Sequence, residues 1–474
     1  MDATSIAVVG AGPVGCLAAV HLAQRGFKVA LYESRSEASF TGASKAQRSI
    51  NLAVSVRGIT ALAAVPHQST DKKSKSLVEL VLEGVVPMSA RMIHSLENGE
   101  TKLVRQEYSP DGECINSFDR AKLNLLLLKQ ATSHTNVQAH FEHTFVNAQR
   151  ARDDATTTLS FYIAGAADPK KYEHSLVLGC DGMNSAVRAK VGPYARINST
   201  HEYIDSGYVE LRIPQAPSPS SHWVNWKMDP SCLHIWPKHD YMLIALPNGD
   251  GSFTSTLFAP FALFDEHLRD ERSALAFFQA NFPDALQAMD EKELLHQVTS
   301  QRPSPLGTVQ CDPMHAGAAV VLLGDAAHAM VPFYGQGLNC GLEDVRIFMQ
   351  ELDAALKQHG SLDKAKGFAL SSYTATRCND VRAIQLLAQE NYTEMRSKVV
   401  NRGYLLRKWL DGLLTRWLPT GWWQSLYVMV TFSNLGYATA RNREMSQRCI
   451  LKRVGQFAIA SVVLVVASQQ WVQW

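Results

Sequence analysis

Three glycines near the N-terminus have the spacing of a phosphate-binding turn. They lie in Gly10-Ala11-Gly12-Pro13-Val14-Gly15, between the apolar run Ile6–Gly10 and a stretch with helical periodicity. In such a turn the first glycine permits the bend, the second lets a pyrophosphate approach the backbone, and the third lets helix and strand pack closely. Glu33 ends the next apolar run, where a carboxylate can accept hydrogen bonds from a ribose. We therefore predict a dinucleotide site; the alternative is a glycine-rich turn with Glu33 as a solvated acid.

Two later segments place an acid directly after a short apolar run. In Cys180–Arg188, Asp181 is followed by a glycine, and Asp181 or Ser185 could simply cap a helix. In Val321–Asp344, Asp325 is followed by a proline and glycines before helical spacing resumes. An aspartate at the end of a buried strand needs a partner, and this segment supplies none. A ligand would be one such partner; a helix N-cap without a ligand is the alternative.

The elements that must position these residues follow from their periodicity. Ile6–Gly10, a helical stretch through Arg25, and Lys28–Glu33 form a β-α-β opening, which is typical of a doubly wound parallel sheet. Long alternating segments from 201 to 261, with turns at 238–240 and 248–251, predict antiparallel hairpins. Helices are expected at Val345–Lys357, Lys364–Leu387 and Tyr392–Leu414. The predicted fold class is α/β, with a Rossmann-like domain, an antiparallel β-sheet domain and a C-terminal α-helical region.

Composition limits the possible functions. At 474 residues the chain is too long for one hydrophobic core. It has 46% hydrophobic and 19% charged residues and a formal net charge of +2, which argues against a nucleic-acid surface. The eight cysteines show neither CxxC pairs nor metal-ligand spacing, so we expect reduced thiols and no metal site. The polar segment His67–Ser76 indicates a solvated excursion without an assignable function.

The C-terminal segment Val454–Trp474 has an apolar centre from Phe457 to Ala467. Lys452 and Arg453 precede it and two tryptophans end it. As a helix it would reach roughly 30 Å, close to one hydrocarbon core. This predicts membrane association, as an anchor that spans the bilayer or as a helix that lies on it; a helix packed on the protein body is the alternative. At the other end Ile6–Gly10 is typical of a strand, so no signal peptide is expected.

Together the three motifs, in this order, resemble those of the single-component FAD-dependent aromatic hydroxylases. Within that group the chain is similar to the family of kynurenine 3-monooxygenases, over about residues 5 to 450. The similar strings are RSINLAVSVRG (48–58), ARMIHS (90–95), GYVELRIP (207–214), LHIWP (233–237), IALPN (244–248), NYTEMRS (391–397) and LYVMVTFS (426–433).

The resemblance implies the residues that bind the substrate. Kynurenine is an amino acid that carries an aminophenyl ketone, and its carboxylate calls for a bidentate cation, which suits arginine. Arg91 matches the family's carboxylate-binding arginine, and Tyr108, Asn391 and Tyr427 match its polar partners. Phe333 and Gln336 would line the space above the flavin ring. Without the resemblance, Arg91 is typical of a surface charge and the tyrosines of core aromatics. Leu233, Ile235 and the strand at 243–246 could form an apolar floor for the aryl ring, while the orientation of Tyr334 is not predicted.

The resemblance also implies the FAD contacts. Asp325 would bind the ribityl chain, and the start of the helix that follows would approach the isoalloxazine, where amide donors favour negative charge. The expected FAD-binding residues are Gly10, Gly12, Val14, Gly15, Glu33, Arg35, Ala53, Arg120, Asp181, Asp325, Gly337, Leu338 and Asn339. No metal is expected.

The reaction implied is hydroxylation of L-kynurenine to 3-hydroxy-L-kynurenine, a step of tryptophan catabolism toward NAD synthesis. NADPH would reduce FAD, and O2 would form a flavin C4a-hydroperoxide that attacks the electron-rich ring. No side chain is expected to act as acid, base or nucleophile, and His328 is predicted to be structural. No second GxGxxG is present for NADPH, so its contacts are not predicted. The implied location is the cytosolic face of the mitochondrial outer membrane.

Two other functions remain compatible with the sequence. A hydroxylase of another aromatic acid would keep the flavin motifs without needing Arg91, Tyr108, Asn391 and Tyr427 together. A non-catalytic flavin-fold binding protein, such as a carrier of lipidated partners, would be expected to lose intact flavin loops. Neither the oligomeric state nor a preference for NADPH over NADH can be predicted.

The expected domain organisation interrupts the FAD-binding domain with the substrate domain. The predicted parts are 1–195 (FAD-binding domain, first part), 196–310 (antiparallel-sheet substrate domain), 311–360 (return of the FAD-binding domain), 361–451 (helical region that caps the substrate site) and 452–474 (membrane-associated tail).

Overall fold

The computed structural model describes residues 5–40, 51–66, 75–109, 111–151, 156–217, 225–395, 402–419 and 421–472. The predicted excursion His67–Ser76 lies outside these residues up to position 74. The end of the predicted tail, 473–474, lies outside them as well.

A six-stranded sheet with the order β18-β19-β12-β1-β2-β8 forms the first layer. Its strands are β1 (Ser5–Val9), β2 (Lys28–Tyr32), β8 (Val137–His140), β12 (Leu176–Gly179), β18 (His315–Ala316) and β19 (Val320–Leu322). All neighbours are parallel except β18 and β19. The predicted β-α-β opening is therefore confirmed, and the segment that leads into Gly324 and Asp325 returns to the same sheet as β19.

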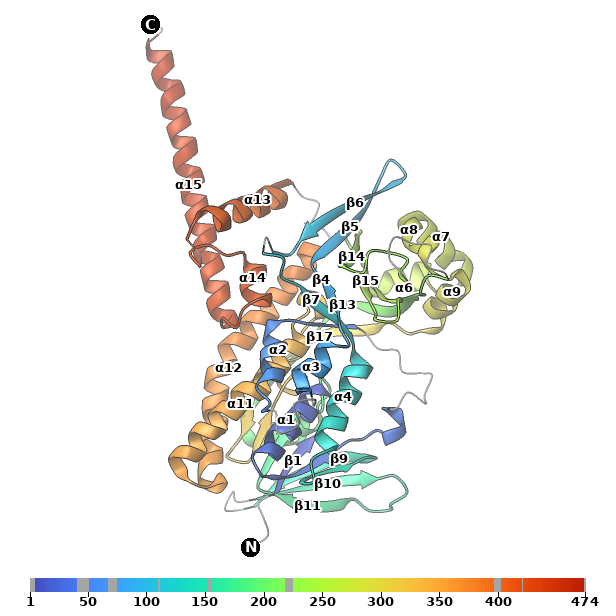
Figure 1. The fold of residues 1–474 in the computed structure, drawn as a ribbon, viewed down its shortest axis with the longest axis vertical. Coiled ribbons are helices and arrows are strands. Elements are labelled where there is room, and N and C mark those ends of the chain that lie inside the picture. Colours follow the sequence, from blue (N-terminus) through green and yellow to red (C-terminus); the bar gives the residue numbers. More distant parts are fainter. Residues whose placement is uncertain are drawn as a thin grey trace.

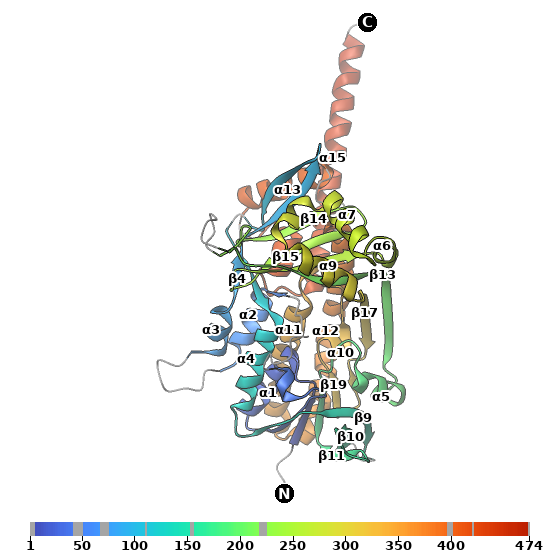
Figure 2. The same ribbon diagram turned by 90° about the vertical axis from the view of Figure 1, so that its right-hand side faces the viewer.

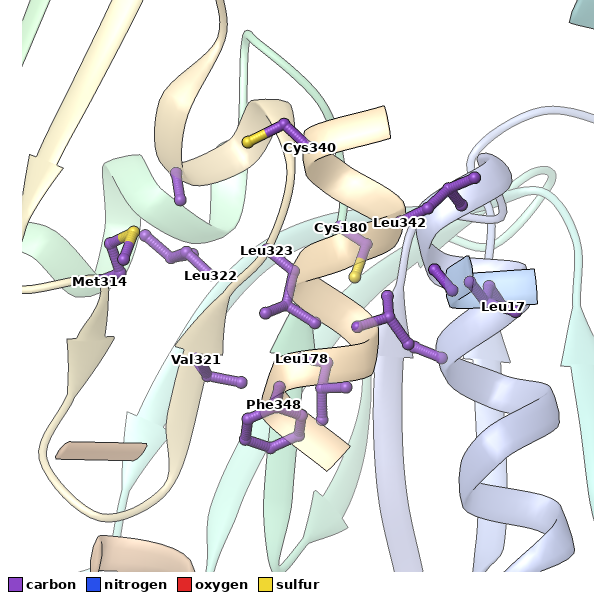
Figure 3. Packing of buried hydrophobic residues seen from close by; sticks show 14 of the residues in the cluster. Leu17, Leu178, Cys180, Met314, Val321, Leu322, Leu323, Cys340, Leu342 and Phe348 are labelled. Atoms are coloured by element: carbon purple, nitrogen blue, oxygen red, sulfur yellow. The ribbon is translucent and has the colours of Figure 1, made fainter. Parts of the chain in front are cut away.

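Three helices pack together beside this sheet: α1 (Pro13–Gln24), α4 (Arg120–Thr132) and α11 (Gly337–His359). Nine consecutive residues of α1, from Gly15 to Ala23, are buried, which is typical of a helix enclosed in a core. Figure 3 shows side chains of β12, β19, α1 and α11 in one cluster, with Leu17, Leu178, Leu323 and Leu342 among them. The acidic and glycine motifs at the strand ends are therefore held by a shared core.

A seven-stranded sheet with the order β17-β13-β16-β15-β14-β5-β6 forms the second unit. Its strands are β5 (Ala90–Glu97), β6 (Glu100–Glu107), β13 (Asn198–Ile213), β14 (Cys232–Pro237), β15 (Met242–Pro247), β16 (Phe253–Ala259) and β17 (Ser304–Asp312). Neighbours are antiparallel except β5 and β14. The hairpins predicted within 201–261 are confirmed. The sheet nevertheless extends beyond the expected 196–310, because β5 and β6 join it from the first part of the chain.

The two faces of this sheet have different partners. On one face Trp236, Leu243 and Ala245 share a core with a group of short helices. These helices are α6 (Phe261–His267), α7 (Glu271–Asn281), α8 (Pro283–Ala288) and α9 (Glu291–Ser300). On the other face Leu233 and Ile244 point toward the dinucleotide motifs. Alternation along β14 and β15 thus leaves one apolar face for a ligand.

Two three-stranded antiparallel sheets and several short helices complete the central part. The sheets are β9 (His143–Arg150), β10 (Thr157–Ile163) and β11 (Lys170–His174), and β3 (Asn51–Val54), β7 (Ile115–Asp119) and β4 (Val86–Met88). The helices are η1 (Glu37–Ser39), α2 (Val56–Ala63), α3 (Leu77–Leu82), α5 (Ala186–Ala195), α10 (Asp325–His328) and η2 (Pro332–Tyr334).

The last third is helical, as predicted, but its boundaries differ. The helices are α12 (Leu362–Thr393), α13 (Arg402–Trp417), α14 (Leu426–Thr431) and α15 (Tyr437–Val472). The expected helix Tyr392–Leu414 is wrong at its start, because Tyr392 belongs to α12. Its buried ring stacks on Phe333 at 4.0 Å and its hydroxyl donates to Ser206, which continues the buried side of α12. We call α13, α14 and α15 the cap.

Figures 1 and 2 show the two chain ends at opposite ends of the molecule. The six-stranded sheet lies toward the N-terminus, and α15 runs outward past the seven-stranded sheet. Ile450, Val454 and Phe457 of α15 are exposed, at a spacing that places them on one side of the helix. Within the described residues, no helix has both the length and the apolar character needed to cross a bilayer.

Candidate active site

A cavity of about 320 Å³ lies between the three motifs and the open face of the seven-stranded sheet. We call it the motif cavity. Its walls include Gly12, Val14, Ala53, Arg120, Asp325, Phe333, Gln336, Gly337 and Leu338, all predicted from the sequence as cofactor or substrate contacts. Cys180 and Gly182 represent the second motif. Segments far apart in the sequence therefore line one space.

The glycines of the first motif have the geometry that the sequence predicts. Gly10 has a φ of +103°, and a Cβ there would lie 2.4 Å from the carbonyl oxygen of Cys180. A Cβ on Gly15 would lie 2.0 Å from the carbonyl oxygen of Gly10. A Cβ on Gly12 would instead meet no atom within 4 Å, and Gly12 faces the cavity. The loop thus leaves open space at the position where a pyrophosphate would pass, which fits FAD.

Glu33 is held by the loop and its own strand end. Its carboxylate accepts hydrogen bonds from the backbone N–H of Ala11 at 3.0 Å and from Arg35, through the backbone N–H and the guanidinium Nε, both at 2.9 Å. Burial opposes its ionisation, but the hydrogen bonds from Arg35 and Ala11 outweigh this and hold the pKa of the carboxyl below its usual value. Neither residue lines the motif cavity, so their contacts with FAD stay a prediction.

Asp181 forms hydrogen bonds within its own turn. Its carboxylate accepts from Ser185 Oγ at 2.5 Å and from the backbone N–H of Val187 at 3.0 Å, while Ser185 caps α5. Burial raises the pKa of this carboxyl. The side chains of Asp181 and Ser185 therefore stabilise the start of α5, as the helix-capping alternative predicts. Gly182 lines the cavity, and Asp181 does not. A role of Asp181 in FAD binding stays a prediction.

Asp325 differs from the expected buried acid. It is exposed and begins α10 beside the motif cavity, so it needs no protein partner. Nearby, α11 begins at Gly337, and Gly337 and Leu338 face the same cavity. Asn339 is fully buried: its Oδ1 accepts from Ser55 N–H at 2.8 Å and its Nδ2 donates to the Ala53 carbonyl at 2.7 Å. Its side chain therefore ties α11 to β3.

Arg91, Tyr108 and Tyr427 form a cluster, which we call the substrate cluster; Arg91 and Tyr108 are buried and Tyr427 is partly buried. The Arg91 guanidinium lies 4.7 Å from the Tyr427 ring centroid and 5.5 Å from that of Tyr108. The two tyrosine rings stack at 5.1 Å with an angle of 13°. Burial raises the pKa of both hydroxyls, so both remain protonated and can donate. The cluster combines one fixed cation with two neutral donors.

A second cavity of about 680 Å³, the cap cavity, lies beside the first. Tyr108, Asn391, Arg407 and Ser425 belong to its lining. Both cavities are lined by Arg91, Tyr334 and Tyr427. Acidic side chains outnumber arginines around the cap cavity: Glu107, Asp111, Glu390, Glu394, Asp411 and Glu444 against Arg91, Arg407 and Arg448. This balance disfavours a nucleotide phosphate there.

Asn391 and Phe333 connect the two cavities. Asn391 is buried on α12 and donates from Nδ2 to the Phe333 carbonyl at 2.7 Å. The Phe333 ring packs edge-on against Phe258, at 5.1 Å between centroids. Tyr334, whose orientation the sequence did not predict, stacks with Tyr427 at 5.9 Å and 21°. All predicted substrate residues thus lie on one cavity or the other.

The wall that the sheet contributes is apolar. It contains Leu233, Met242, Ile244, Leu246 and Phe258. Ile235, which the sequence analysis added to this floor, is buried but does not line the cavity. On the opposite face His94 Nδ1 lies 2.6 Å from Asp284 and His94 Nε2 lies 2.8 Å from His234 Nδ1.

His328 lies in a buried charge network and does not line either cavity. Its Nε2 lies 2.5 Å from Asp344 Oδ2, and Arg377 Nε donates to Asp344 Oδ1 at 2.8 Å. Burial opposes ionisation of Asp344, but His328 and Arg377 outweigh it and lower the pKa of the carboxyl. Arg377 also pairs with Glu343, which in turn pairs with Arg57. The structural interpretation of His328 agrees with this placement.

His328, Cys340 and Asp344 bring potential metal-ligand atoms within 4.8 Å of one another in the described part of the chain. The Arg377 guanidinium already lies there, with Nη2 3.2 Å from Cys340 Sγ. A fixed cation and a metal ion would repel each other. The eight cysteines are free, and five of them are buried.

Sequence reasoning gave no role to Arg57, Glu343, Asp344 or Arg377. A signal was present in α12, where Tyr373, Arg377 and Val381 share one helix face by their spacing. An arginine between two apolar residues on that face indicates a buried, paired charge. Arg57 offered no such signal, because its partners are distant in sequence.

The chain is similar to known flavoproteins over almost its whole length. Residues 3–385 match the family model described as "FAD binding domain". The chain is 42% identical to the kynurenine 3-monooxygenase of Mycosarcoma maydis, over 98% of this chain and 92% of that protein. It is also 42% identical to the enzyme of that name from Yarrowia lipolytica, over 95% and 93%. The Saccharomyces cerevisiae enzyme is 37% identical, over 94% of both chains.

Solved structures share the fold at lower identity. Pseudomonas aeruginosa PqsL in complex with 2-aminobenzoylacetate superposes with a TM-score of 0.64 at 20% identity, over 83% of this chain and 97% of that one. The tetrameric form of 2-methyl-3-hydroxypyridine-5-carboxylic acid oxygenase also gives 0.64 at 20%, over 85% and 96%. A variant of Klebsiella pneumoniae HpxO complexed with FAD gives 0.60 at 18%, over 88% and 95%.

Proposed function

The chain belongs to the family of FAD-dependent kynurenine 3-monooxygenases, and we propose on this premise that it hydroxylates L-kynurenine at ring carbon 3 with NADPH and O2. The observation that carries the proposal is the position of the substrate cluster. Arg91 and Tyr427 lie where the motif cavity and the cap cavity meet, beside the apolar wall that the seven-stranded sheet contributes. A hydroxylase for a different aromatic acid would not require this combination.

Arg91 binds the substrate carboxylate. Its guanidinium is held by the two stacked tyrosines, so the loss of side-chain freedom on binding is small. Burial strengthens a charge-assisted hydrogen bond. The Tyr108 and Tyr427 hydroxyls are neutral donors to the same carboxylate, and Asn391 closes the cluster from α12. The acidic side chains of the cap cavity suit the ammonium group of the amino acid.

The aryl ring of the substrate lies in the motif cavity. Leu233, Ile244, Leu246 and Phe258 form the apolar side, and Phe333 forms the side near α11. These residues exclude water and fix the ring in one plane. The ring carbon that reacts is then presented toward the α11 N-terminus, where Gly337 and Leu338 line the cavity.

FAD would be held by the Gly10–Gly15 loop, with Gly12 facing the cavity, and by Asp325, Ala53, Arg120 and the start of α11 in the cavity wall. Glu33 and Arg35, which pair with each other beyond this wall, would contact it at the end of β2. When bound, FAD supplies the activation of O2 and the oxygen atom transfer, with electrons from NADPH. The N-terminal amides of α1 and α11 favour its negative groups, since neither helix has a side-chain N-cap.

Membrane association is the further part of this proposal, at the cytosolic face of the mitochondrial outer membrane. Its support is α15, which runs outward from the body (Figure 1). Ile450, Val454 and Phe457 are exposed on one side of this helix, and an apolar sequence follows them. Removal of the residues after Arg453 should release the protein from membranes and leave FAD bound. Unchanged fractionation of the truncated chain would refute the role of the tail.

The deciding experiment for the reaction is NADPH oxidation by the purified yellow protein, with and without L-kynurenine, and product identification by mass. The expected result is a large stimulation coupled to the gain of one oxygen atom. Bound flavin without stimulation or hydroxylation would leave the fold intact and refute the substrate assignment.

A further inference from the structure

Arg57 joins the cap to the FAD-binding part of the molecule. Its side chain is fully buried on α2. Its Nε donates to the Val430 carbonyl of α14 at 3.0 Å, and its Nη2 donates to the Leu435 carbonyl just before α15. Its Nη1 donates to Glu343 of α11 at 3.0 Å. One guanidinium thus holds the start of α15 at a fixed position above α11.

Tyr437, the first residue of α15, lies directly on this guanidinium. The Arg57 Cζ is 3.8 Å from the centroid of the Tyr437 ring, and both side chains are fully buried. The Tyr437 hydroxyl donates to Gln336 Oε1 at 3.0 Å. The contact therefore runs from α2 through the start of α15 to the loop that lines the motif cavity.

In the Gln336 carboxamide, the oxygen Oε1 already has a hydrogen-bond partner and the nitrogen Nε2 has none in the described part of the chain. Gln336 lies at the N-cap position of α11 and is 2% exposed, and it lines the motif cavity next to Gly337. Its Oε1 accepts a hydrogen bond from the Tyr437 hydroxyl, so the carboxamide cannot rotate without losing that bond. Within the described residues no acceptor receives a hydrogen bond from its Nε2. The amide N–H groups are left to donate to a ligand in the cavity.

We propose that Tyr437 is a positioning residue that fixes the Gln336 carboxamide, so that its N–H groups donate to the ketone oxygen of the bound substrate. The inference rests on the proposed function, because the ketone belongs to kynurenine. The hydrogen bond holds the aryl ketone in one orientation, which sets the ring carbon that faces the flavin. Since Tyr437 reaches Gln336 only when the cap is docked through Arg57, docking of the cap completes the donor.

The test replaces the hydroxyl and keeps the ring. Tyr437→Phe preserves the ring contact with Arg57 and removes the hydroxyl that donates a hydrogen bond to Gln336 Oε1. For one neutral hydrogen bond of about 0.5–1.5 kcal/mol, we expect the Kd and KM for L-kynurenine to rise about two- to tenfold. We also expect a smaller share of the NADPH oxidised to yield hydroxylated product. FAD content should stay unchanged, and Tm should fall by at most a few degrees.

A ketone-free ligand separates positioning from a general structural effect. The Kd of the FAD-loaded protein is measured by flavin absorbance for L-kynurenine and for its analogue with a methylene in place of the ketone. The wild-type protein should prefer L-kynurenine, and Tyr437→Phe should lose most of that preference. An equal loss of affinity for both ligands, or no loss for either, would overturn the proposal.

Tyr373→Phe is the matched control. Tyr373 is also fully buried in a helix, but its hydroxyl has no hydrogen-bond partner in the described structure. Its removal should change neither Kd nor coupling. If the wild-type protein itself does not hydroxylate L-kynurenine, the proposed function fails; if it does and the two ligands respond alike to Tyr437→Phe, only this inference fails.

Discussion

The nucleotide loop, Gly10–Gly15, and the substrate cluster, Arg91, Tyr108 and Tyr427, are built in opposite ways. The loop is continuous and acts through its backbone; its shape follows from residues that lack a Cβ. The substrate cluster acts through side chains from β5, from the residue after β6 and from α14. Its geometry exists only when the seven-stranded sheet and the cap are both in place. Local sequence therefore determines the first site, and tertiary packing determines the second.

The largest effect expected is at Gly15, which tests whether the loop is set by sterics alone. A Cβ there would lie 2.0 Å from the Gly10 carbonyl oxygen, against backbone that cannot move aside cheaply. Gly15→Ala should abolish FAD binding and lower Tm by many degrees, measured by flavin absorbance and thermal unfolding.

Gly12→Ala is the informative partner of that change. Its Cβ would meet no protein atom within 4 Å, but it would project into the space for the pyrophosphate. This variant should keep the Tm of the FAD-free protein and lose FAD affinity. Normal FAD affinity in Gly12→Ala would refute the assigned path of the cofactor.

The next effect addresses the substrate cluster alone. Arg91→Lys keeps the charge and loses the planar fork that matches a carboxylate. The loss of a charge-assisted hydrogen bond of about 1.5–3 kcal/mol should raise the KM for L-kynurenine about 10- to 100-fold. FAD content should not change, because the nucleotide loop does not depend on this side chain.

Arg105→Lys is the control for Arg91→Lys, because it makes the same substitution on the adjacent strand β6. Arg105 lies on β6 and lines neither cavity; it pairs with Asp229 and with Glu107, of which only Glu107 lines the cap cavity. It should leave KM within about twofold, as for exposed ion pairs worth less than about 1 kcal/mol. A fall in FAD content in Arg91→Lys would mean that the two sites are coupled, contrary to the comparison.

What the sequence could predict follows the same division. The loop, the β-α-β opening and the alternation that turns Leu233 toward the cavity each depend on neighbouring residues, so the periodicity predicts them. The pairing of β5 with β14 and the Arg57–Glu343 pair join distant segments, and no local pattern specifies them. Arg91 was assigned through family resemblance, because an isolated arginine on a strand is typical of a surface.

Asp325 lines the cavity, but the reason for which the sequence argument selected it is wrong. The sequence argument expected a buried acid that requires a partner, whereas Asp325 is exposed to the cavity. The buried acids of this region are Glu343 and Asp344 of α11, and the partners of Asp344 are His328 and Arg377. Burial depends on how α11 and α12 pack, which the motif alone does not contain.

The smallest effect concerns the stability of the FAD-binding part against acid. Burial, and after it the nearby His140, lower the pKa of His174 to about 4. Its ring nitrogens already contact Ser5 Oγ and the Tyr32 hydroxyl. The unfolded chain has a histidine pKa near 6.5, so between about pH 6.5 and 4 the unfolded state binds the additional proton. The stabilisation is therefore complete above pH 6.5 and is lost as the pH falls, by up to about 1.4 kcal/mol per pH unit.

His174→Gln should flatten this dependence, because glutamine can keep hydrogen bonds to Ser5 and Tyr32 but does not titrate in this range. The measurement is the free energy of unfolding of the FAD-loaded protein from pH 7 to 5, by urea denaturation. His201→Gln, at an exposed histidine, is the control and should leave the slope unchanged. Equal slopes in His174→Gln and the wild-type protein would mean that acid acts elsewhere, for instance at the His94–His234 pair behind the substrate wall, where burial lowers the pKa of His234 to about 4. The acid-sensitive region would then be the assembled sheet and not the local FAD-binding core.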